Sequence, residues 1–105
     1  MTERITRITL FKIPNEEDQK KILGLYQHMP QKALKDGKPY ILSVKAGLAV
    51  PDQRAQGFTI AAVSSFASRE DMDYYDNECV AHAELKVIAK GSHQGFAMVF
   101  FKEQV

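Results

Sequence analysis

The chain lacks tryptophan and holds a single cysteine, Cys79, among its 105 residues. One cysteine excludes an internal disulfide, and this is typical of a protein from a reducing compartment. No segment approaches the roughly 18 apolar residues of a membrane-spanning helix, and the first residues, Met1 to Arg4, lack the basic and apolar regions of a secretory signal. We therefore expect a cytoplasmic protein that does not enter a membrane.

An excess of charge of either sign is also missing, because 14 Lys and Arg stand against 13 Asp and Glu. The basic residues are scattered, whereas nucleic-acid binding needs them clustered. The three histidines, His28, His82 and His93, are well separated and there is one cysteine, so no metal-ligand spacing is present. We expect no nucleic-acid partner, no metal and no other cofactor, and we expect His28 and His93 to be exposed.

The remaining composition is that of an ordinary globular domain, with 45% hydrophobic and 26% charged residues. A chain of this size buries roughly two thirds of its unfolded surface, which is enough for one core. There are no repeats, low-complexity segments or linkers. We therefore predict one domain over residues 1–105.

Strand and helix signals alternate along the chain. Segments rich in β-branched and aromatic residues predict strands over 4–13, 40–48, 58–66 and 96–102. Asn15 caps a helix that Pro30 ends or restarts, and Ser68 caps a shorter helical turn, with Asp71 at the capping-box position. A further helix covers 79–90 and stops at Gly91. The predicted order is β-α-β-β-α-β, the α+β, ferredoxin-like arrangement.

The third and fourth predicted strands are apolar on both faces, as Val63 and Val99 illustrate. Strands of this kind are buried on both sides. The helices can cover only one face of a four-stranded sheet, and the chain has no spare element for the other. We therefore predict a homodimer in which two sheets pack face to face.

Several segments together resemble the stress-responsive A/B barrel family of dimeric α+β barrels. They are Ile8-Thr9-Leu10-Phe11-Lys12, Ser43-Val44-Lys45-Ala46-Gly47, Gly57-Phe58-Thr59, Ser65-Phe66-Ala67-Ser68-Arg69-Glu70-Asp71-Met72 with Tyr74-Tyr75, and Ala81-His82. Their order and spacing carry the similarity, which extends over nearly the whole chain. It implies a ferredoxin-like subunit whose sheet pairs with that of a second copy to form a barrel.

The resemblance also implies candidate site residues. The family includes a polyketide cyclase that makes olivetolic acid without a cofactor, and its site Tyr and helical His correspond to Tyr75 and His82. Its first-strand histidine corresponds to Arg7. The family segment His-Pro-x-His or Asp-Pro-x-His reads Cys79-Val80-Ala81-His82 here, so its first polar residue and its proline are absent.

Each candidate has a functional and a structural interpretation. The imidazole of His82 suits proton transfer near neutral pH, with the Tyr75 hydroxyl binding an oxyanion. Alternatively, His82 bonds a backbone carbonyl and Tyr75 is core. Arg7 either binds a polar end of a substrate or forms an internal salt bridge. Cys79 is either a nucleophile or a small buried hydrophobe.

Five further residues are candidates for substrate binding. Thr9 and Phe11 share a strand face with Arg7, while Ile22, Leu23 and Tyr26 would line any cavity between the first helix and the sheet. All five also suit a plain core.

Three functions remain open. One is a non-catalytic homodimer that binds a small hydrophobic or carbonyl-containing ligand, or acts through its surface in the stress response. Another is a cofactor-independent cyclase, lyase or isomerase of polyketide-like substrates that uses His82 and Tyr75. A monooxygenase on the same barrel fold is disfavoured, because the chain lacks a suitable Asn/Trp/His set.

Overall fold

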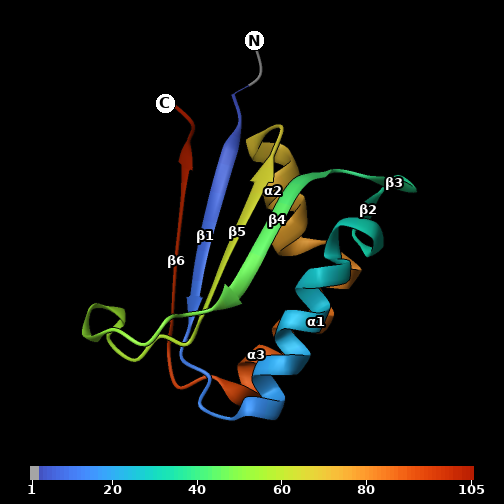
Figure 1. The fold of residues 1–105 in the computed structure, drawn as a ribbon. Coiled ribbons are helices and arrows are strands. Elements are labelled where there is room, and N and C mark those ends of the chain that lie inside the picture. Colours follow the sequence, from blue (N-terminus) through green and yellow to red (C-terminus); the bar gives the residue numbers. More distant parts are fainter. Residues whose placement is uncertain (1–2) are drawn as a thin grey trace.

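The computed structural model describes residues 3–105, and it places the three α-helices on one face of a four-stranded antiparallel sheet (Figure 1). The strand order is β4-β5-β1-β6. The strands are β1 (Ile5–Phe11), β4 (Ile41–Leu48), β5 (Ile60–Phe66) and β6 (Phe96–Lys102). This topology confirms the predicted ferredoxin-like α+β fold.

Three helices cover the sheet. The first, α1 (Glu16–Lys32), packs on β4 and against α3 (Val80–Ser92), and α2 (Arg69–Asn77) packs on β5 and α3. Both predicted caps form: Asn15 Oδ1 accepts a hydrogen bond from the Asp18 amide and Ser68 Oγ accepts one from the Asp71 amide, each at 3.1 Å. Within residues 3–105, no helix combines the length and apolar character that a membrane crossing requires.

Some predicted boundaries were wrong. Helix α1 continues through Pro30 to Lys32, and α3 continues through Gly91 to Ser92. Gly91 does not adopt the positive φ of a helix-ending glycine, so the helix extends to a cap at His93, whose backbone N–H donates to the Ala89 carbonyl.

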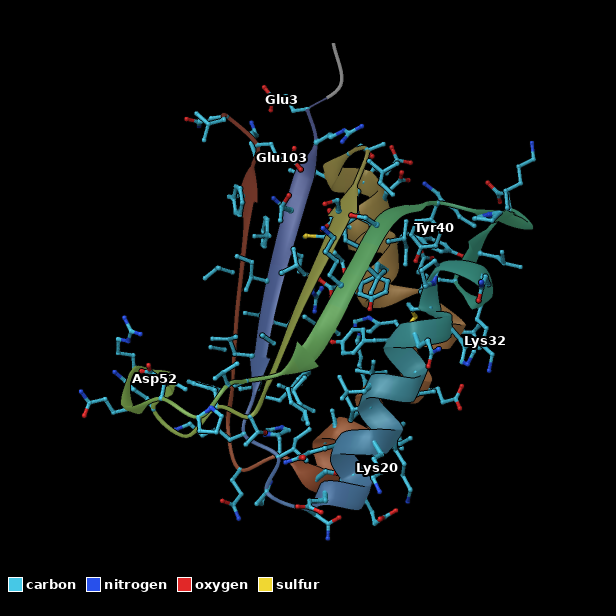
Figure 2. All side chains as sticks on the ribbon, in the orientation of Figure 1. Glu3, Lys20, Lys32, Tyr40, Asp52 and Glu103 are labelled. Carbon is cyan, nitrogen blue, oxygen red and sulfur yellow. The ribbon has the colours of Figure 1, made fainter. Side chains whose placement is uncertain are left out.

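The first three strands are also shorter than predicted, the fourth has the predicted bounds, and a small hairpin and a short helix were missed. The first strand ends at Phe11 rather than at residue 13, and the third begins at Ile60 rather than at Phe58. A small hairpin of β2 (Leu34–Lys35) and β3 (Lys38–Pro39) turns at 36–37, where both residues have positive φ. The loop after β4 holds the short helix η1 (Gln53–Ala55), next to Asp52, and extends away from α1 and α3 (Figure 2).

The register of the sheet assigns each side chain to a face. Arg7 pairs with Ser64 of β5 and Phe100 of β6, and Thr9 pairs with Ala62 and Met98. The buried residues of β1 and β5 that share this face pack beneath the helices. The largest fully buried side chains are Ile13, Ile22, Met29, Ile60, Phe66, Met72, Tyr75 and Leu85.

The opposite face of the sheet has no covering element among the described residues. On β6, Val99 is 61% exposed and Phe101 is 46% exposed. Beside them on β1, Ile8 pairs with Val99 and is only partly buried. Glu3 and Glu103 lie at the same end of the sheet (Figure 2), where the Thr6 hydroxyl donates to Glu103 at 2.6 Å.

Candidate functional site

A cavity of about 510 Å³ lies between α3 and the strands β1 and β6. It exists because α3 packs chiefly against α1 and α2, which leaves space between it and the two strands. Most of its wall is apolar, with polar and cationic groups interspersed. The lining residues are Arg7, Thr9, Phe11, His82, Leu85, Lys86, Ala89, Lys90, His93, Phe96 and Met98. Three of the predicted substrate-binding residues, on β1, therefore share a cavity with His82.

Arg7 is held at one end of this cavity by several contacts. Its Nη1 donates to Asp76 Oδ1 at the end of α2, and its Nε donates to the Thr9 hydroxyl at 3.4 Å. The guanidinium also lies 5.3 Å from the centre of the Tyr75 ring. The internal salt bridge is thus present, and it compensates for burial of the cation, whose side chain is 10% exposed.

His82 is buried and stacked on Tyr75. The ring centres are 3.7 Å apart with an interplanar angle of 12°, and His82 Nδ1 lies 2.8 Å from the Tyr75 carbonyl oxygen. Since a carbonyl can only accept, Nδ1 must carry the proton that it donates. Because Nδ1 carries the proton of the neutral ring, the other nitrogen, Nε2, keeps its lone pair. Nε2 has no protein partner within residues 3–105.

The environment keeps His82 neutral. The pKa of His82 is lowered to about 4, chiefly by burial and also by the nearby Arg7 guanidinium, while the hydrogen bond to the Tyr75 carbonyl opposes the shift. At neutral pH the side chain is therefore a neutral base with its free lone pair on Nε2.

Tyr75 lies behind His82 in the core. It is 1% exposed, its ring contacts Phe66 with centres 5.3 Å apart, and it is not among the residues that line the cavity. Burial raises its pKa well above the usual range, so the hydroxyl stays protonated. The observed contacts of Tyr75 position His82 through the carbonyl and the ring. Its predicted role as an oxyanion donor stays a prediction.

The three candidates on α1 lie elsewhere. Leu23 and Tyr26 line a separate groove of about 540 Å³ between α1 and β4, and Ile22 is fully buried in the core. The separation arises because α1 lies over β4, whereas α3 faces β1 and β6. Burial raises the pKa of Tyr26 to about 12, and the Arg7 charge opposes this shift in part.

His93 was wrongly expected to be exposed. It is partly buried and lines the cavity next to Phe11 and Phe96. The sequence offered little signal, because a histidine after a predicted helix end is most simply placed in solvent. Lys86 and Lys90 also line the cavity. Their spacing of one helical turn places them on the same face of α3, but that this face borders the cavity is known only once α3 is placed.

Cys79 is buried at the N-terminus of α3, where its side chain makes no capping bond. Within residues 3–105 there is no group of three or more His, Cys, Asp or Glu side chains that could hold a metal ion.

An antiparallel four-stranded sheet that is covered by helices on one face, with a mainly apolar cavity beside α3, defines the class of ferredoxin-like α+β domains. The sequence model of the Stress responsive A/B Barrel Domain matches residues 5–101. The chain belongs to this family.

Three known proteins illustrate the similarity. The chain is 42% identical over 105 residues to a "Fusaristatin A biosynthesis cluster protein" of Gibberella zeae, covering 99% of this chain and 76% of that protein. Its fold is similar to that of a hydroxynitrile lyase from Passiflora edulis, with a TM-score of 0.81, 17% identity, and coverage of 99% and 96% of the two chains. A dimeric ferredoxin-like protein of unknown function from Thermobifida fusca gives a TM-score of 0.80, 15% identity, and coverage of 98% and 93%.

Proposed function

We propose that this protein binds a small, mostly apolar carbonyl compound in the cavity between α3 and the strands β1 and β6. The observation that carries this proposal is the cavity itself. Its apolar wall, which includes Phe11 and Met98, suits a hydrocarbon body, and the buried His82 and Arg7 supply polar groups at one end. A pocket of this size with few polar groups is typical of small-molecule sites.

The protein acts as a homodimer in this proposal. The outer face of the sheet exposes apolar side chains such as Val99 and Phe101, and a second copy would cover them. The ferredoxin-like protein from Thermobifida fusca, which has a similar fold, is described as a dimer, and this supports the arrangement.

The ligand comes from small-molecule metabolism in this proposal. The support is that the relative from Gibberella zeae, at 42% identity, bears the name of a biosynthesis cluster protein. The cavity suits such a ligand because its apolar wall can orient a compound and exclude water.

Binding can be tested with 4-phenyl-2-butanone as a probe, titrated into isotope-labelled protein and followed by two-dimensional NMR. Ala89→Leu places a larger side chain in the cavity, because Ala89 is buried and lines it. We expect at least tenfold weaker binding in this variant. Val87→Leu is the matched control, because Val87 lies two residues away on the same helix and is 73% exposed. This variant should bind the probe as the natural chain does. Equal binding in both variants would contradict the proposed site.

A second candidate function is a cofactor-independent cyclase, lyase or isomerase. The arrangement of His82 favours it, because the Tyr75 carbonyl fixes Nδ1–H and leaves the lone pair of Nε2 available to accept a proton. The lowered pKa of about 4 makes this nitrogen a weaker base than a free imidazole. In this candidate Tyr75 holds the imidazole in place and also retains its predicted role as a hydrogen-bond donor to a developing oxyanion. Arg7 holds the polar end of the substrate.

The same ketone separates the two functions. A general base at His82 would speed the exchange of the protons next to the ketone carbonyl for deuterium in heavy water, which NMR measures directly. We expect His82→Gln to lower the protein-dependent exchange rate by about 10²-fold or more, with the probe still bound. Exchange no faster than in buffer would rule out the base role for this ketone and leave the binding function.

A further inference from the structure

The far end of the cavity holds a second histidine, His93, at the C-terminus of α3. We propose that His93 is a hydrogen-bonding contact for the ligand, and that the ligand is an elongated apolar molecule with a polar group at each end. This inference rests on the proposed function and adds the class of ligand and a residue that selects it.

His93 is fixed between two aromatic side chains but lacks polar partners. Its ring centre is 5.5 Å from that of Phe96, nearly edge-on, and 6.5 Å from that of Phe11. The backbone N–H of His93 caps α3 through the Ala89 carbonyl, which holds the residue in place. Side-chain Nδ1 is buried and has no hydrogen-bond partner among residues 3–105.

A buried polar atom without a partner costs free energy, which a bound ligand can recover. Rotation of the imidazole by half a turn exchanges Nδ1 with Cδ2 and Nε2 with Cε1, so a nitrogen can be presented to a ligand from either edge of the ring. A hydroxyl group suits both tautomers, because it donates and accepts. His93 can therefore bind a hydroxyl, and its donor form can bind a carbonyl.

The positions of the two histidines set the length of the ligand. His82 lies near the beginning of α3 and His93 caps its end, so the helix advances about 16 Å between them. The opposite wall of the cavity has a similar length, because β1 advances about 13 Å from Arg7 to Phe11. An extended carbon chain advances about 1.2 Å per bond, so about ten carbons with an oxygen at each end span the cavity.

Donor groups at the first end can bind a polar group of the ligand. Arg7 and Lys86 both donate to Asp76, the first to its carboxylate and the second to its backbone carbonyl. The carboxylate balances the charge of Arg7, whereas the backbone carbonyl is uncharged, so Lys86 keeps its positive charge beside the cavity. A carbonyl or hydroxyl oxygen of the ligand can accept a hydrogen bond at this end.

The test compares 1,10-decanediol with 1-decanol, whose difference is one terminal hydroxyl. The diol is symmetric, so it can place a hydroxyl at each end in either orientation. NMR titration gives both dissociation constants in the natural chain, in His93→Phe and in His28→Phe. His93→Phe keeps the aromatic contacts, and His28 is an exposed residue of α1 that serves as the control. We expect His93→Phe to lower the affinity for the diol relative to the alcohol by about two- to tenfold, and His28→Phe to leave this ratio unchanged.

His93→Leu provides a second apolar replacement if the phenylalanine variant does not fold. An unchanged ratio in the folded variant would overturn the role of His93 while leaving the binding function intact. Failure of both probes to bind the natural chain would contradict the proposed function and, with it, this inference.

Discussion

At the scale of single residues, Arg7 and Asp76 form the contact on which the site most depends. Arg7 is nearly buried on β1, and Asp76, in the last turn of α2, has a side chain that is 26% exposed. Removing the carboxylate leaves a guanidinium enclosed beside Tyr75 without its counter-charge, and buried charges without partners are costly.

We expect Asp76→Asn to lower the free energy of unfolding by about 2 kcal/mol, below the 3–5 kcal/mol typical of broken buried pairs because Asp76 is partly exposed. Urea denaturation measures this change. Asp73→Asn is the control on the same helix, because Asp73 pairs with Arg69 at 3.0 Å on the surface and should contribute less than about 1 kcal/mol. Equal losses of unfolding free energy in the two variants would show that burial does not increase the contribution of the Arg7–Asp76 pair to stability.

The second residue-scale prediction concerns the pH dependence of stability. The pKa of His82 in the folded chain is about 4, mainly because of burial, compared with roughly 6.5 for a free histidine. Protonation therefore favours the unfolded chain, so the stability provided by the neutral ring is complete above about pH 6.5 and is lost as the pH falls toward 4.

By linkage, this loss amounts to about 3 kcal/mol at pH 4. We expect the free energy of unfolding, measured in urea from about pH 7.5 to about pH 4, to fall by that much more in the natural chain than in His82→Gln. The difference between the two curves isolates His82 from the carboxylates that titrate in the same range. Parallel curves would mean that burial does not perturb this imidazole.

At the scale of elements, α2 illustrates how a short helix positions the site. Its nine residues carry Tyr75 and Asp76, and a helix of this length is marginal without tertiary contacts and caps. The Ser68 hydroxyl satisfies the Asp71 amide in its first turn.

Ser68→Ala should lower the free energy of unfolding by about 1 kcal/mol, because the Asp71 amide loses its partner. Thermal denaturation followed by circular dichroism measures the change. Ser68→Thr keeps the hydroxyl and should remain close to the natural chain. A stable alanine variant would indicate that packing of Met72 and Tyr75 alone holds α2 in place.

At the scale of the whole molecule, the uncovered face of the sheet governs assembly. Val99 is 61% exposed on this face of a single copy, so a charge there does not enter the core of the subunit. In the proposed homodimer it would be enclosed between two sheets, where an unpaired carboxylate is costly.

Val99→Asp should therefore produce a folded monomer, whereas the natural chain should be dimeric by light scattering at micromolar concentration. Val87→Asp, on the outer surface of α3 where Val87 is 73% exposed, is the control and should leave the mass unchanged. A natural chain that is itself monomeric would refute the homodimer.

Local signals in the sequence determined which segments form strands and helices, and which side chains of β1 lie on the same face. Alternation along β1 grouped Arg7 with Thr9 and Phe11, and the structure places these three residues along one cavity. The caps at Asn15 and Ser68 were predictable because they depend on residues only three positions apart.

The tertiary structure decided which groups meet across the chain. Asp76 could not be assigned as the partner of Arg7 from sequence, because their contact depends on how α2 lies on the sheet. The stacking of Tyr75 on His82 depends on the break between α2 and α3 at Glu78 and Cys79, not on a continuous helix. Likewise, His93 lines the cavity only because α3 continues past Gly91 and ends beside β1 and β6. Local periodicity determines the face on which a side chain lies, whereas its partners depend on the packing of distant segments.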